Sequence, residues 1–148
     1  MTAPRPVSRR RSREAALQVL YALDLTSGAA GGEASDPEVA FAAAGDHFEL
    51  PEGARAFAKE LVTGVRSHLE QLDELISCSA THWRLGRMAA VDRNLLRLAS
   101  YEMSHLGTPP GVAIDEAVEL ARRFGGERSP GFVNCVLDGV ARRLEEAS

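Results

Sequence analysis

The chain has 148 residues and a formal net charge of −4 at pH 7. A single domain of this length buries about 68–70% of the surface of its unfolded chain, so a disulfide framework or structural metal is not needed for stability. No segment approaches the ~20 apolar residues of a membrane-spanning helix, and the basic start lacks the cleavage site of a secretory signal, which predicts a cytoplasmic protein without a membrane partner.

Residues 8–25, SRRRSREAALQVLYALDL, predict a first helix with an unusual charge. The first 13 residues hold no acid and carry +5, which leaves −9 on the remainder, through Arg5, Arg9, Arg10, Arg11 and Arg13. These charges oppose the positive end of the helix dipole. At 100° per residue, Arg9, Arg10, Arg11 and Arg13 surround the helix axis, so we expect an arm that projects beyond the core or unravels into a tail. Such an arm can bind the phosphates of a polyanion, with a merely solubilising tail as the alternative.

Apolar residues recur at helical spacing along nearly all of the remaining chain, and no run alternates like a strand. The first helix is expected to end before the Gly/Ser/Ala-rich residues 26–35. A short helix is predicted over residues 36–45, with Asp36 as its N-cap and Pro37 at its first position. Residues 51–80 are long enough for two helices, which we expect to join near Ser67–Leu69.

The C-terminal half predicts three more helices. The first has an apolar stripe that includes Met88, Leu95 and Leu98 and is stopped by the sequence GTPPG at residues 107–111. The second covers residues 112–124, with Gly125 as its C-cap. In the last, Ser129 is expected to be the N-cap, and Pro130 takes the first position. The whole chain is therefore predicted to be all-α, with six or seven helices.

The residues that usually carry catalysis are scattered. There is no Gly-rich phosphate loop, nucleophile elbow or paired-histidine helix. Cys78 and His82 are four residues apart, but two ligands do not hold a zinc ion. Cys78 and Cys135 are interpreted as buried small apolar residues in a reducing compartment. We therefore predict no catalytic residue, no metal site and no cofactor.

One aromatic residue near the C-terminus lies outside its apolar stripe. Phe132 falls about 100° from the centre of the stripe, in the first turn of the last helix and close to Arg128. An aromatic ring beside a guanidinium group is a candidate platform for stacking of an unpaired base. Packing against a neighbouring element is the alternative interpretation.

Four blocks of sequence, in order, resemble the NusB family of bacterial transcription antitermination factors. They are RRRSREAALQVLYALDL, a tryptophan followed by RMAAVDRNLLRLASYE, then PPGVAIDEAVELARRFG and SPGFVNCVLD. The similarity runs from about Arg9 to Leu144. It implies two packed three-helix bundles, an N-terminal subdomain over about residues 8–80 and a C-terminal subdomain over about residues 81–148.

The resemblance also implies a function that is not enzymatic. It implies pairing with NusE, a small-subunit ribosomal protein, and binding of the single-stranded boxA element of nascent RNA. The setting is the antitermination complex that keeps RNA polymerase elongating through ribosomal RNA operons. The expected RNA-binding residues are Arg9, Arg10, Arg11, Arg13 and Phe132, with Arg128 beside it. The partner surface maps onto Tyr21, Asp92 and Arg93.

Three points stay open in the sequence. A homologous domain precedes the catalytic domain of some RNA methyltransferases, so an RNA-binding accessory domain of such an enzyme is the alternative, although no cofactor-binding domain follows Ser148. A partner-binding bundle without RNA contact is a third interpretation. The family usually has glycine where this chain has Cys135, which puts close helix packing there in doubt. Family members differ in oligomeric state, so both a monomer and a homodimer are compatible with the sequence.

Overall fold

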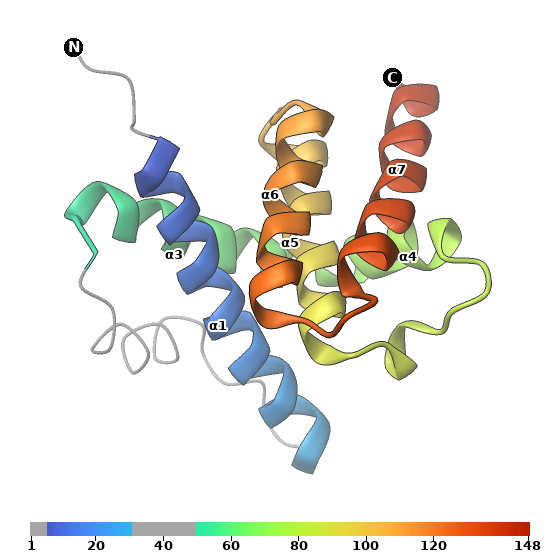
Figure 1. The fold of residues 1–148 in the computed structure, drawn as a ribbon, viewed down its shortest axis with the longest axis horizontal. Helices are drawn as coiled ribbons and strands as arrows, with labels where there is room; N and C mark the ends of the chain where they lie inside the picture. The colour runs from blue at the N-terminus through green and yellow to red at the C-terminus, as the bar shows by residue number, and fades with distance from the viewer. Residues whose placement is uncertain (1–5, 31–49) are drawn as a thin grey trace. The chain divides into compact units, whose positions relative to one another are not determined.

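The computed structural model describes residues 6–30 and 50–148, with side chains described for residues 9–25 and 50–148. Within these residues every regular element is a helix, which confirms the all-α prediction (Figure 1). The elements are α1 (Pro6–Ala30), α3 (Glu52–Ser67), α4 (Leu69–Ser79), the 3₁₀ turn η1 (Leu85–Arg87), α5 (Ala90–His105), α6 (Pro110–Phe124) and α7 (Ser129–Ala147). The helix predicted over residues 36–45 lies outside the described residues.

The sequence predicted the junction between α3 and α4 correctly but placed the end of α1 too early. Residues 51–80 form α3 and α4, separated at His68, which confirms the junction expected near Ser67–Leu69. By contrast, α1 continues to Ala30, so the end predicted before residue 26 was wrong. The preference of glycine and serine for loops is a weak tendency, at most about 1 kcal/mol per residue, that a continuing helix overrides.

The described helices belong to two compact units, which divide between Arg66 and Ser67. The second unit holds α4 to α7, in which α5, α6 and α7 pack against one another and α4 packs against α5 and α7. Leu72 and Ile76 bury the inner face of α4. The division therefore falls one helix earlier than the boundary expected near residue 80, and the second unit contains four helices rather than three.

In the first unit, α1 and α3 bury the apolar stripes that the sequence predicted. The buried side chains include Leu17, Leu20 and Leu23 of α1, and Ala58, Leu61 and Val65 of α3. A polar contact fixes the position of one helix along the other, since the buried Ser12 Oγ donates a hydrogen bond to the carbonyl oxygen of Ala54 at 2.7 Å. The start of α1 is thereby held against the start of α3.

Helix α5 of the second unit is buried on most of its sides, polar residues included. Its buried polar side chains are Asp92, Asn94, Arg97, Ser100 and Glu102. The Arg97 guanidinium donates from Nε to Asp73 Oδ1 at 2.7 Å and from one terminal nitrogen to Asp73 Oδ2 at 2.9 Å. Its other terminal nitrogen donates to Asn94 Oδ1 at 3.2 Å. The two parallel hydrogen bonds from Arg97 to the Asp73 carboxylate hold α5 against α4 in one relative orientation.

The prediction that both cysteines are buried was wrong, because Cys78 and Cys135 are exposed. Cys135 lies on the outer side of α7, beside the buried stripe of Val133, Val136, Leu137 and Val140. The close approach of backbone to side chain on this helix occurs instead at Gly139, where an added Cβ would lie 3.3 Å from Ser79 Cβ. Cysteine in place of the family's glycine at residue 135 is therefore compatible with the packing of α7.

The turn between α6 and α7 confirms one predicted cap and corrects the other. Gly125 is the C-cap of α6, as predicted, and its φ of −93° belongs to a backbone conformation that any residue adopts. Arg128 is the N-cap of α7, while Ser129 Oγ accepts a hydrogen bond from the backbone N–H of Gly126 at 2.9 Å. A Cβ at Gly125 would lie 2.6 Å from Ser129 Cβ and 2.8 Å from the Ala121 carbonyl oxygen. Glycine is required at residue 125 because a side chain there would collide with Ser129 and Ala121, and not because of its backbone conformation.

Gly125→Ala should therefore destabilise the protein by about 1–3 kcal/mol, the usual cost of forcing atoms into a filled site. Urea denaturation measures this loss. Gly131→Ala is the matched control, because a Cβ there meets nothing within 4 Å and the site is an exposed turn of α7. Alanine at Gly131 should be neutral or stabilising by up to about 1 kcal/mol. Equal free energies of unfolding for Gly125→Ala and Gly131→Ala would show that the turn between α6 and α7 shifts to accommodate a Cβ at residue 125 without loss of stability.

Candidate nucleic-acid interface

The arginines of the first helix divide into an exposed set and a buried one. Arg9, Arg10 and Arg11 are exposed, whereas Arg13 is only 5% exposed. The expectation that these residues project beyond the core or form a tail is corrected, because Ser12 is buried against α3 as well. The first turn of α1 has no acidic residue. Three guanidinium groups and the positive end of the helix dipole thus favour an anion at the same place.

Arg9 is oriented by an aromatic ring. Its Cζ lies over the ring of Phe57 in α3, 4.3 Å from the ring centroid. The Ser12–Ala54 hydrogen bond lies three residues after Arg9 on α1 and three residues before Phe57 on α3, so the contact belongs to the packing of α1 on α3. Stacking uses the face of the guanidinium plane and leaves the N–H groups at its edge for phosphate oxygens. Arg9 is therefore held in place and stays able to bind an anion.

A second group of residues lies at the start of α7, where Phe132 contacts Trp83. The two ring centroids are 5.5 Å apart and the ring planes are inclined at 73°, an edge-to-face arrangement. Phe132 is half-buried, whereas Trp83 is 59% exposed. Arg128 is exposed at the N-cap of α7, and its carbonyl oxygen accepts the backbone N–H of Phe132 at 3.1 Å.

Reasoning from periodicity missed Trp83. It lies in the irregular segment between α4 and α5, where no stripe predicts which way a side chain faces. Its residue type was the one available signal, because a tryptophan outside the apolar stripes is a candidate contact residue.

The structure gives Arg93 an internal contact. One terminal nitrogen of its guanidinium donates to the carbonyl oxygen of Leu85 at 3.0 Å and to that of Met88 at 3.1 Å. Leu85 is the first residue of the η1 turn that follows Trp83, and Met88 is the C-cap of this turn. Arg93 thus ties the start of α5 to this turn, and its predicted role in partner binding stays a prediction.

The other two residues predicted to bind a partner differ in exposure. Tyr21 is 38% exposed on α1 in the first unit. Asp92 lies in the first turn of α5 in the second unit and is 8% exposed. Within the described part of the chain, its Oδ1 is buried and has no hydrogen-bond partner. A buried carboxylate oxygen without a donor is uncommon and is suited to receive one from a bound molecule.

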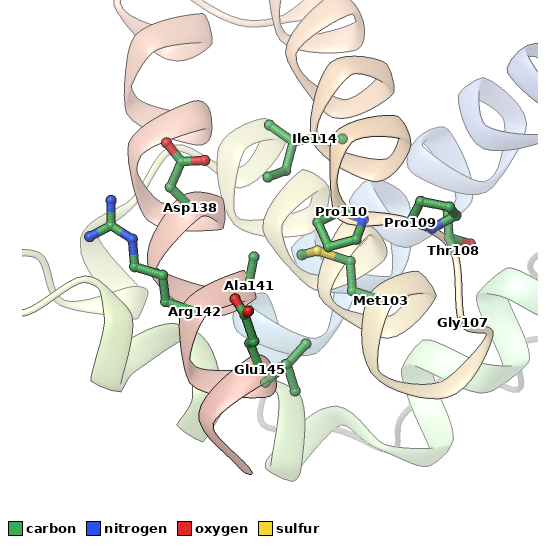
Figure 2. Close-up of a pocket in the computed structure, with 12 residues that line it drawn as sticks. Met103, Gly107, Thr108, Pro109, Pro110, Ile114, Asp138, Ala141, Arg142 and Glu145 are labelled. Atoms are coloured by element: carbon green, nitrogen blue, oxygen red, sulfur yellow. The ribbon is translucent and has the colours of Figure 1, made fainter. Parts of the chain in front are cut away.

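A hollow elsewhere in the second unit does not fit RNA. It has a volume of about 740 Å³, and Figure 2 shows Met103, Pro110 and Ile114 on one side and Asp138, Arg142 and Glu145 on the other. Its lining holds one arginine, two acids and no aromatic ring. A surface without net positive charge and without a stacking ring lacks both kinds of contact that single-stranded nucleic acid requires.

The histidines and cysteines do not form a metal site among the described residues, where no group of three or more His, Cys, Asp or Glu side chains could hold an ion. The His68 and His105 rings are 4.0 Å apart. Burial, and secondarily the charge of His68, lowers the pKa of His105 below its ordinary value.

No helix in the described ranges combines the length and apolar character needed to cross a membrane.

Known proteins resemble the chain over nearly its whole length. The sequence model of the NusB family matches residues 10–142. A transcription antitermination protein NusB of Desulfitobacterium hafniense is 45% identical over 141 residues, which cover 95% of this chain and 92% of that protein. A solved structure of T. maritima NusB has a TM-score of 0.81 at 35% identity, covering 96% of this chain and 93% of that one. A crystal structure of the antitermination factors NusB and NusE in complex with dsRNA has a TM-score of 0.79 at 28% identity, covering 94% and 99%.

Proposed function

This chain belongs to the NusB family of transcription antitermination proteins, and from that premise we propose that it binds RNA together with NusE. The observation that carries the RNA proposal is the exposed set Arg9, Arg10 and Arg11 at the acid-free start of α1. A relative of the same fold is known in complex with NusE and double-stranded RNA, which supports both partners. Family members are antitermination factors and not enzymes, so no catalytic residue is assigned.

We further propose that the natural RNA is the single-stranded boxA element of ribosomal RNA operon transcripts. The antitermination complex of RNA polymerase in the cytoplasm is the proposed setting. Exposed arginines bind the backbone of any RNA, whereas an aromatic ring needs a base that is not paired. The presence of Phe132 and Trp83 at one place favours a strand with splayed bases over a duplex.

A polarisation titration tests this proposal. Labelled boxA single strand, the same sequence in a duplex and a scrambled single strand are each titrated with the protein, alone and with NusE. We expect the boxA single strand to bind most tightly, and NusE to strengthen that binding. Equal affinity for the boxA and scrambled strands would refute the boxA assignment and leave general RNA binding in place.

Asp92→Lys should weaken pairing with NusE by about 30-fold or more, because removing a buried interface charge costs at least about 2 kcal/mol and the lysine then repels a basic ribosomal protein. Calorimetric titration with NusE measures the effect. Asp92→Asn is the control, since it removes the charge and keeps the side-chain shape. Asp92 is buried, so thermal unfolding is measured for each variant. A folded Asp92→Lys variant with unchanged NusE affinity would show that the partner surface is elsewhere.

A further inference from the structure

Trp83 combines a large exposed ring with a backbone that is fixed on both sides. It exposes 59% of its surface, although tryptophan is highly buried on average. Its backbone N–H donates to the carbonyl oxygen of Ala80 at 3.0 Å, directly after α4. On its other side, Arg93 holds the η1 turn through the carbonyl oxygens of Leu85 and Met88. The ring is therefore presented to solvent from an ordered segment.

Phe132 orients this ring without covering it. The edge-to-face contact at 5.5 Å is one of the preferred geometries of an aromatic pair. Phe132 is itself fixed, because the next residue on α7, Val133, is fully buried in the core. The indole of Trp83 is therefore positioned in advance of binding, which lowers the entropy that a ligand must offset.

The charge around the ring favours a nucleic acid. Residues 81–88 contain Arg84 and Arg87 and no acid, and both arginines are exposed. Arg128, four residues and one helical turn before Phe132, is exposed as well. An exposed ring on a segment that carries exposed arginines and no acid supplies the stacking surface and the phosphate contacts that a single strand needs.

We propose that the indole face of Trp83 is a stacking platform for one unpaired base of the bound RNA. Phe132 is the positioning residue for this platform, and Arg84 contacts the phosphate next to the stacked base. This site rests on the RNA-binding function proposed above and adds a second point of contact in a different unit from the arginines of α1.

The chain has one tryptophan, so its fluorescence reports directly on this site. The full-length protein is titrated with a short labelled single strand that carries boxA, and polarisation and tryptophan emission are recorded together. We expect emission to be quenched along the same binding curve. Trp83→Leu should weaken binding by about 5- to 150-fold, the value of one stacked base. Trp83→Phe keeps a ring and should lose less, and Val112→Ala, at another exposed apolar residue, should lose nothing.

A double-mutant cycle tests the role of Phe132. Phe132→Leu should weaken RNA binding in the wild-type background and have little further effect in the Trp83→Leu background, because both changes remove the same stacked base. A Phe132 that matters only for folding would lower thermal stability and leave the RNA affinity of the folded protein unchanged in both backgrounds.

The possible outcomes separate this site from the general function. Polarisation that shows binding without quenching, or with unchanged affinity for Trp83→Leu, overturns the platform and leaves RNA binding in place. If NusE quenches the tryptophan emission and RNA does not, the Trp83 ring belongs to a protein interface, and this result also overturns the proposed stacking platform. Absence of binding to the wild-type protein refutes the proposed function and this site with it. If Trp83→Leu does not fold, the quenching of the wild-type protein decides the question.

Discussion

Replacement of Arg9, Arg10 and Arg11 together by alanine should weaken RNA binding more than any single change elsewhere in the chain. These three side chains are exposed at the start of α1. A charge-assisted hydrogen bond contributes about 1.5–3 kcal/mol, so three lost contacts correspond to a loss of affinity on the order of 1,000-fold or more. The plot of log affinity against log salt should also flatten, by about 0.7 per lost contact on a single strand and about 2 in total. Polarisation at several salt concentrations measures both quantities.

The triple variant also loses the contact between Arg9 and the Phe57 ring, so its thermal unfolding is measured beside its RNA affinity. A second triple variant, with alanine at the exposed Arg122, Arg123 and Arg142, removes the same charge from α6 and α7 and is the control for net charge. An unchanged salt slope in the α1 variant would show that this helix contacts no phosphate. Arg13→Ala is kept separate, because Arg13 is buried and its loss should lower the free energy of unfolding.

Asp73→Ala should destabilise the protein by about 3 kcal/mol. The change leaves the Arg97 guanidinium, whose side chain is 9% exposed, without the carboxylate that neutralises it. Breaking a buried ion pair costs about 3–5 kcal/mol, and the 25% exposure of Asp73 places the expected loss at the lower end. Urea denaturation followed by circular dichroism gives the difference in the free energy of unfolding.

The structure offers a matched control for this ion pair. Arg122 and Glu119 form an exposed pair at 3.1 Å on α6, with side chains 63% and 42% exposed. Glu119→Ala should cost about 0.5 kcal/mol or less, because water and salt screen such a pair. The double change Asp73→Ala with Arg97→Met should be less destabilising than Asp73→Ala alone, since it removes both charges of the buried pair. If Asp73→Ala lowered the free energy of unfolding by no more than Glu119→Ala does, the Arg97 guanidinium would be hydrated by solvent in the variant.

The helices could be predicted because each is long enough to repeat its apolar stripe several times. Leu61 and Val65 on α3, and Leu72 and Ile76 on α4, are buried as their spacing predicts. The break between these two helices was predicted near Ser67–Leu69, and the structure confirms it. The arginine-rich start was also evident, because charge is a property of the residues and does not depend on how the helices pack.

Single-sequence reasoning alone could not assign the exposure of individual residues beside a stripe. Cys78 and Cys135 were predicted to be buried and are exposed, whereas Arg13 was predicted to lie on a projecting arm and is buried. Helical spacing defines the direction of a side chain relative to its own helix. It does not define which other segment covers that direction, so residues at the margin of a stripe can take either environment.

The sequence by itself determined the all-α class, the positions of most helices, the cluster of positive charge at the start of α1 and the family. Only the tertiary structure decided which residues meet: Arg9 with Phe57, Arg97 with Asp73, and Trp83 with Phe132. Each of these pairs joins residues from different segments of the chain. Their meeting depends on how helices and turns pack against one another, because a local pattern of apolar residues specifies one element at a time and carries no information about its neighbour in space.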